Sequence, residues 1–220
     1  MPLIYLVRHG ETAWNREHRW QGQRDVPLTA LGEAQARAAG RRLAHLDPRP
    51  TTLYASPLIR AWRTAELIGE ACRLEPIVVP AMQEVDVGSW EGLTAEEAGV
   101  RDPKGVERWH SGGTGWIDGE TYAEMSDRVC AAVRELVARH PERSERILVV
   151  AHGGPIRAIV TAAALLPPEG RSHFANGPNG AITVIDAQPQ RWVVVSYNNS
   201  GHVDGLTPEV AEEALQPSTE

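Results

Sequence analysis

Two histidines occupy equivalent places in the sequence, and their chemistry is nucleophilic or acid–base. His9 follows the apolar run 3–7 and precedes a glycine, whereas His152 follows the apolar run 146–151 and precedes two glycines. Short apolar runs of this kind are typical of buried strands, and a glycine turn lets the backbone approach a ligand closely. A lone histidine after a strand is usually structural. Two in the same architectural position indicate a shared site.

Arginine completes the pattern. Arg8 adjoins His9, and Arg60 lies in the first turn of a helix that we expect Ser56 to cap and Pro57 to begin. The free N–H groups of a helix start favour an anion, and a guanidinium binds phosphate through two parallel hydrogen bonds. A single arginine is most often a solvated surface residue. The pair beside two histidines predicts a phosphate clamp.

Alternating strands and helices position these residues. Strands are expected at 3–7, 51–55, 76–80 and 146–151, with a final hairpin of 181–186 and 191–197 around Pro189, and the main helices at 29–46, 56–72, 121–140 and 155–165. The alternation predicts an α/β fold, a three-layer α/β/α sandwich with a mostly parallel central sheet. Ligands of such sheets bind beyond the carboxyl ends of the strands, where both histidines lie.

The chain is expected to form one domain over residues 1–207. Residues 81–119 have poor periodicity and form an excursion over the active-site edge, with a short helix opened by the capping box of Thr94 and Glu97. The excursion would shape the non-phosphate end of the site. Residues 208–220 form an acidic tail that we expect to fray.

Composition excludes several classes of protein. The 220 residues are 42% hydrophobic and 23% charged, which is ordinary for a globular protein. A net charge of -7 argues against a nucleic-acid partner. No run approaches the roughly 18 apolar residues of a membrane span, and the start does not resemble a signal peptide. We expect a cytoplasmic protein without a cofactor, monomeric or homodimeric, whose partner is a small-molecule phosphomonoester.

The ordered motifs resemble those of the histidine phosphatase superfamily, which includes the phosphoglycerate mutases. They are Leu6-Val7-Arg8-His9-Gly10-Glu11-Thr12 with Asn15, the looser Trp20-Gln21-Gly22, Ser56-Pro57-Leu58 with Arg60-Ala61 and Thr64-Ala65, Glu84-Val85-Asp86-Val87-Gly88 with Trp90-Glu91-Gly92, Gly119-Glu120-Thr121 and Ala151-His152-Gly153-Gly154. Together they reach across most of the chain. The resemblance implies a phosphoglycerate mutase-like fold.

The resemblance also implies a role for each matching residue. His9 would take the phosphoryl group as a phosphohistidine, and Arg8, Arg60 and His152 would hold its oxygens. Glu84 would act first as general acid and then as the base that activates water. The implied substrate-binding residues are Asn15, Gln21, Gly22 and Gly153.

A metal-free mechanism agrees with these side chains. A nucleophilic imidazole must be neutral, and two adjacent arginine charges should lower the pKa of His9. His9, His152 and Glu84 could in principle ligate a divalent ion. The arginines would repel such an ion, however, and no HxH or HExxH spacing is present. We therefore expect no metal.

Three functions remain open at this point: a phosphatase acting on a small phosphorylated metabolite, a phosphoglycerate mutase, and a non-catalytic module that binds phosphorylated ligands. The segment around Glu84 looks like the phosphatase branch, and the chain is compact after that residue, where mutases usually carry extra sequence. A binding module could dispense with His9 and Glu84, but both are present. Phosphatase is the favoured interpretation.

Overall fold

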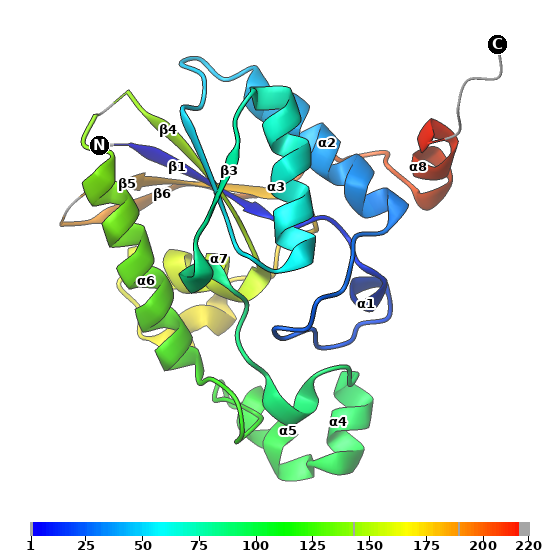
Figure 1. The fold of residues 1–220 in the computed structure, drawn as a ribbon. Coiled ribbons are helices and arrows are strands. Elements are labelled where there is room, and N and C mark those ends of the chain that lie inside the picture. Colours follow the sequence, from blue (N-terminus) through cyan, green and yellow to red (C-terminus); the bar gives the residue numbers. More distant parts are fainter. Residues whose placement is uncertain (1, 143, 189, 216–220) are drawn as a thin grey trace.

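A six-stranded sheet runs through the middle of the protein in the computed structural model, which describes residues 2–142, 144–188 and 190–215 (Figure 1). The strands are β1 (Leu3–Arg8), β2 (Thr52–Ala55), β3 (Pro76–Val78), β4 (Arg146–Ala151), β5 (Ile182–Ala187) and β6 (Trp192–Asn199), in the order β3-β2-β4-β1-β5-β6. Strands β1 to β4 are mutually parallel, and β5 runs antiparallel to both β1 and β6. The mostly parallel sheet and the C-terminal hairpin are confirmed. Pro189, expected at the hairpin turn, lies outside the described residues.

Helices cover both faces of the sheet. They are α2 (Ala30–Ala44) and α3 (Ile59–Cys72) on one face, and α6 (Tyr122–Arg139) and α7 (Gly153–Ala163) on the other. Side chains alternate between the two faces of a strand, and β4 shows the result. Ile147 and Val149 pack in the core with α6 and α7, whereas Leu148 and Val150 pack with α2 and α3. The three-layer sandwich is confirmed.

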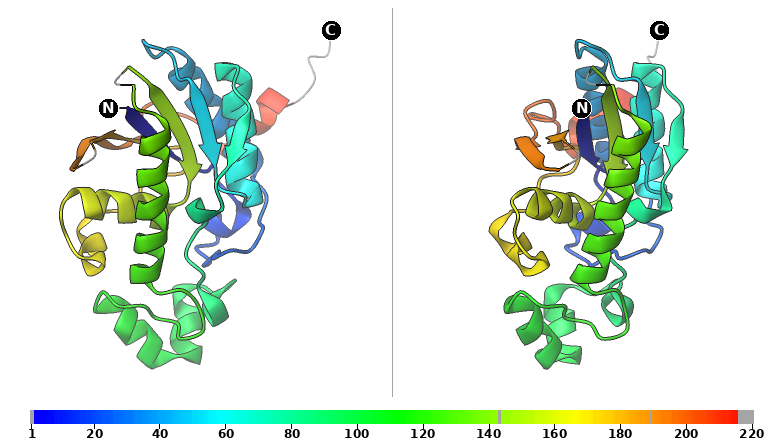
Figure 2. Two further views of the ribbon diagram at one scale, coloured as in Figure 1. Left: turned by 60° about the vertical axis from the view of Figure 1, so that its left-hand side comes forward. Right: turned by 90° about the vertical axis from the view of Figure 1, so that its left-hand side faces the viewer.

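The segment that follows β3 extends past the carboxyl ends of the parallel strands (Figure 2). It contains η1 (Pro80–Met82), η2 (Gly88–Trp90), α4 (Ala95–Arg101) and α5 (Pro103–His110). The capping box of Thr94 and Glu97 opens α4 as expected. Helix α5 was not expected, although its start carries a signal: Asp102 accepts the N–H of Gly105, and Pro103 occupies the first turn.

The start of α3 differs from the expectation. The helix begins at Ile59, and Ser56 does not cap it. Instead, Asp25, which is distant in sequence, accepts the N–H of Ile59 through Oδ1 at 2.8 Å. The Ser56 hydroxyl lies 2.8 Å from Nε2 of His152. Because side-chain contacts between distant segments replace the local cap, the sequence pattern alone placed this boundary too early.

Three short helices complete the chain: α1 (Ala13–Arg16), η3 (Pro168–His173) and α8 (Pro208–Leu215). Helix α8, where an acidic tail was expected, packs against α2. Residues 216–220 of that tail lie outside the described residues. Within the part of the chain that the structure describes, no helix combines the length and apolar character needed to cross a membrane.

Candidate active site

Strand register brings the two histidines together. In the parallel pair β1 and β4, Arg8 lies opposite Ala151, so the residue that follows each strand occupies the same level. The rings of His9 and His152 have centroids 5.1 Å apart. Both side chains are buried, His9 with 3% and His152 with 0% exposure. The site therefore begins where these two strands end.

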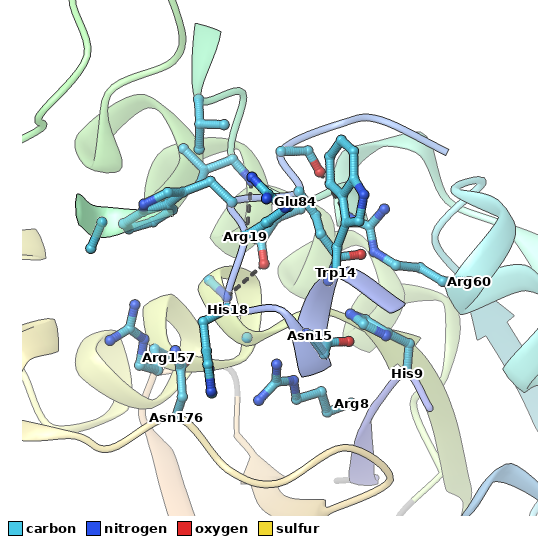
Figure 3. Close-up of a pocket in the computed structure, with 18 of the residues that line it drawn as sticks. Arg8, His9, Trp14, Asn15, His18, Arg19, Arg60, Glu84, Arg157 and Asn176 are labelled. Atoms are coloured by element: carbon cyan, nitrogen blue, oxygen red, sulfur yellow. Dashed lines mark hydrogen bonds between the residues drawn. The ribbon is translucent and has the colours of Figure 1, made fainter. Parts of the chain in front are cut away.

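A pocket of about 430 Å³ opens in front of His9 (Figure 3). The sequence-predicted residues that line it are Arg8, His9, Asn15, Gln21, Gly22, Arg60, Glu84 and Gly153. His152 does not line the pocket and lies fully buried beside His9. The excursion contributes Val85, Val87, Ala95 and Trp109 to the wall. Residues from both ends of the chain and from its middle thus share one cavity.

The surroundings of His9 determine its tautomer. Nδ1 lies 2.7 Å from the carbonyl oxygen of Gly10, which can only accept, so Nδ1 carries the proton. Nε2 is then left with a free lone pair. Burial, and after it the charges of Arg60 and Arg8, hold the pKa of His9 well below its ordinary value. The expected effect of the arginines is present, but loss of solvent is the larger cause.

Two hydrogen bonds fix the loop that carries His9. The N–H of Gly10 donates to Oγ1 of Thr64 at 3.0 Å, and Nδ2 of Asn179 donates to the carbonyl oxygen of His9 at 2.9 Å. Asn179 also donates to Oδ1 of Asn15 at 3.2 Å. Because that oxygen is occupied, the amide nitrogen of Asn15 is the atom available to a ligand. Sequence analysis missed Asn179, which carries no local motif, and assigned no role to Thr64, although Thr64 belongs to the motif that contains Arg60.

Arg60 is fully buried on the first turn of α3. It donates to the carbonyl oxygens of Arg24 at 2.7 Å and Gly22 at 2.8 Å, and Arg8 donates to that of Gly177. Burial lowers the pKa of Arg60 to about 10, so the guanidinium stays charged at neutral pH. The Nε atoms of Arg8 and Arg60 are buried without a partner among the described residues. A buried cation with a spare donor favours an anion beside it.

Glu84 lines the same pocket, and backbone N–H groups hold its carboxyl group. Oε1 accepts from Val85 at 2.9 Å, and Oε2 accepts from Gly154 at 3.2 Å, at the N-terminus of α7. That helix starts at Gly153, two residues before the expected start. A Cβ added at Gly154 would overlap Oε1 of Glu84. Glycine here therefore lets the carboxyl group reach the helix end.

The donor set of the site is cationic. In the described ranges, no group of three or more His, Cys, Asp or Glu side chains has an arrangement that could hold a metal ion. The pocket instead presents guanidinium, amide and backbone N–H donors around one unprotonated imidazole nitrogen. Such donors suit an anion with several oxygens, and phosphoryl transfer depends on charge stabilisation and positioning of this kind.

Comparison with known proteins identifies the family. The family model of the histidine phosphatase superfamily (branch 1) matches residues 4–200. The chain belongs to this superfamily. Its histidine phosphatase fold is also that of a mycobacterial glucosyl-3-phosphoglycerate phosphatase solved with VO3. The two chains have a TM-score of 0.82 and 31% identity, over 91% of this chain and 100% of that one.

Curated members of the histidine phosphatase superfamily also resemble this chain. A metal-independent phosphoserine phosphatase from Arabidopsis thaliana is 33% identical over 212 residues, which cover 92% of this chain and 84% of the relative. A probable phosphoglycerate mutase from an Enterobacter species is 40% identical over 205 residues, which cover 90% of each. As a member of this superfamily with phosphatase relatives, the protein is a phosphoric monoester hydrolase.

Proposed function

We propose that this phosphatase works without a metal and passes the phosphoryl group of a small metabolite through Nε2 of His9. One observation carries the proposal: a neutral imidazole, with its proton held on Nδ1, faces a pocket beside two buried guanidiniums with unpaired donors. An imidazole in this state has a lone pair for attack. The guanidiniums neutralise the charge that builds up on the phosphoryl oxygens.

In the first step, the Nε2 lone pair bonds to phosphorus, and the bond from phosphorus to the leaving oxygen breaks. Glu84 donates its proton to that oxygen, so the product leaves as an alcohol. Arg8, Arg60, the amide of Asn15 and the N–H of Gly153 bind the phosphoryl oxygens. In the second step, Glu84 takes a proton from water and the water oxygen bonds to phosphorus. The bond from phosphorus to Nε2 breaks, its electron pair returns to Nε2, and inorganic phosphate is released.

His152, whose ring centroid lies 5.1 Å from that of His9, assists the transfer from a buried position. Its Nε2 pairs with the Ser56 hydroxyl, and its Nδ1 is buried without a partner in the described part of the chain. The Ser56 oxygen also accepts the N–H of Leu58 at 3.4 Å, so its hydroxyl proton is free to be given to Nε2. His152 then carries its own proton on Nδ1, where it serves as a donor to a phosphoryl oxygen.

A phosphoglycerate mutase is the second candidate, because a relative with that name is 40% identical. Chain length does not separate the two activities, since the matched region covers 90% of both chains. A mutase returns the phosphoryl group to a second hydroxyl, whereas a phosphatase gives it to water. A coupled assay with 3-phosphoglycerate, run with and without 2,3-bisphosphoglycerate, separates these outcomes.

Hydrolysis of p-nitrophenyl phosphate in excess EDTA tests the proposal. The wild-type protein should release phosphate, and His9→Ala should lower kcat by about 10³-fold or more, because the nucleophile is gone. Wild-type protein quenched in alkali during turnover should carry phosphate on histidine. Undiminished turnover by His9→Ala, or activity abolished by EDTA, would overturn the assignment.

A further inference from the structure

Arg157 lines the active-site pocket away from His9, where we place the reacting phosphate (Figure 3). It lies on α7 four residues after Gly153, whose N–H we place on the phosphoryl group. Residues four apart share a helix face and differ by about 6 Å along the axis. In Figure 3, Arg157 and Asn176 lie side by side at one end of the pocket, and His9 lies at the other.

The side chain of Arg157 has no anionic partner in the part of the chain that the structure describes. Among the described residues, no hydrogen bond or ion pair to it is present, and its Nε atom is buried without a partner. Two other arginines nearby already have partners. Arg19 pairs with Glu17 at 2.8 Å and Glu97 at 2.7 Å, and Arg171 donates to two carbonyl oxygens of the excursion.

A second cavity of about 430 Å³ adjoins the first. The residues that line both cavities are Trp20, Trp109, Arg157 and Asn176. Arg157 therefore stands at their junction, where a substrate that extends past its phosphate would meet it. Its charge also lowers the pKa of Arg8 on one side and of Arg171 on the other, though burial is the larger cause in both.

We propose that Arg157, with the amide of Asn176, binds a carboxylate of the substrate about one helical turn from the reacting phosphate. The inference rests on the proposed function, because it takes the phosphate to sit at His9. One free guanidinium matches one negative charge. The second cavity is also lined by Arg171 and Glu169, whose charges oppose each other, and the Arg171 guanidinium already donates to two backbone carbonyl oxygens. A second phosphate dianion would therefore meet the negative charge of Glu169 and only one guanidinium without a partner among the described residues. A planar carboxylate can also accept two parallel hydrogen bonds from arginine.

Matched substrates test the subsite. 3-Phosphoglycerate and glycerol 3-phosphate differ in that the first carries a carboxylate where the second carries a hydroxymethyl group. Wild-type protein should hydrolyse 3-phosphoglycerate with the higher kcat/KM. Arg157→Gln should lower that value about 10–100-fold and change the value for glycerol 3-phosphate less than about threefold, since only the first substrate loses a charged hydrogen bond. Arg157→Lys should recover part of the loss.

Control measurements distinguish failure of the carboxylate subsite from failure of the proposed phosphatase function. Arg19→Gln removes a pocket arginine that is already paired and should leave the ratio of the two kcat/KM values unchanged. Fructose 1,6-bisphosphate compared with fructose 6-phosphate reports on a second phosphate, and a larger preference there would overturn the choice of a carboxylate. Equal kcat/KM values for the matched pair, with normal turnover of p-nitrophenyl phosphate, would overturn the subsite alone. Absence of turnover with every ester would overturn the function itself.

Discussion

At Glu84, two backbone N–H groups hold a carboxyl group next to the N-terminus of α7. If this group protonates the leaving oxygen, its importance depends on how basic that oxygen is. Glu84→Gln should lower kcat/KM for an alkyl phosphate about 10²–10⁴-fold. The loss for p-nitrophenyl phosphate should stay below about tenfold, because p-nitrophenolate departs without a proton.

Steady-state kcat/KM measured on both esters checks this difference, since it reports the step in which the P–O bond breaks. Glu107→Gln, which changes an exposed carboxylate on α5, should leave both values unchanged. Equal losses on the two esters would mean that Glu84 positions the phosphate and does not donate a proton.

The side chains that carry out the chemistry could be predicted from the sequence, whereas the residues that hold them in place could not. A charge or a lone pair belongs to the side chain itself, as in His9, Arg8 and Arg60. The predicted strand ends indicated where these side chains meet, because ligands bind beyond the carboxyl ends of parallel strands. Asn179 and Thr64 act through ordinary polar groups that gain meaning only once the loop of His9 packs against them. Arg157 likewise carried no signal in the sequence, because its lack of a partner is a property of the folded molecule.

Among the elements, α3 depends on a contact from outside itself. Asp25 accepts the N–H of Ile59, and neighbouring carbonyl oxygens of the same loop accept from Arg60. Asp25→Ala should lower the free energy of unfolding by about 1 kcal/mol through loss of this cap. It should also weaken inhibition by inorganic phosphate a few-fold, because the loop that holds Arg60 loosens.

Urea unfolding and phosphate inhibition measure the two effects. Asp25→Asn keeps an oxygen at the same place and should retain most of both. If Asp25→Ala matches the wild type in both measurements, the hydrogen bond between Ile59 and Asp25 does not stabilise the helix. If Asp25→Asn loses as much stability and phosphate affinity as Asp25→Ala, the effect comes from the negative charge of Asp25 near Arg60 and not from the hydrogen bond with Ile59.

Helix existence was easier to predict than helix boundaries. The capping boxes at Thr94 and Thr121 are complete within four residues, and both open helices. The start of α3 could not be found this way, since Asp25 lies more than thirty residues earlier in sequence. The structure of residues 81–119 could not be predicted, because their packing depends on contacts between tryptophans that are distant in sequence. Trp20, for example, packs against Trp109 and Trp116.

At the scale of the whole molecule, the active site makes folding sensitive to acid. Burial first, and nearby positive charges second, hold the pKa values of His9 and His152 well below the ordinary value. In the unfolded chain each imidazole takes up a proton near pH 6.5. As pH falls below that value, the unfolded state binds protons that the folded state does not, so stability is lost.

The free energy of unfolding, measured in urea at pH 7.5, 6.5 and 5.5, should therefore stay nearly level above about pH 6.5 and fall below it. Each of the two histidines contributes at most about 1.4 kcal/mol per pH unit to this slope, and the loss continues until the pH reaches the folded-state pKa. His9→Gln removes one titrating group, keeps a neutral side chain of similar size, and should make the slope shallower by about one proton. An unchanged slope in that variant, or a wild-type stability that is flat down to pH 5.5, would mean that solvent reaches these rings and protonates them in the folded protein. The same outcome would remove the physical basis for a neutral nucleophile, so stability and catalysis can be judged on one titration.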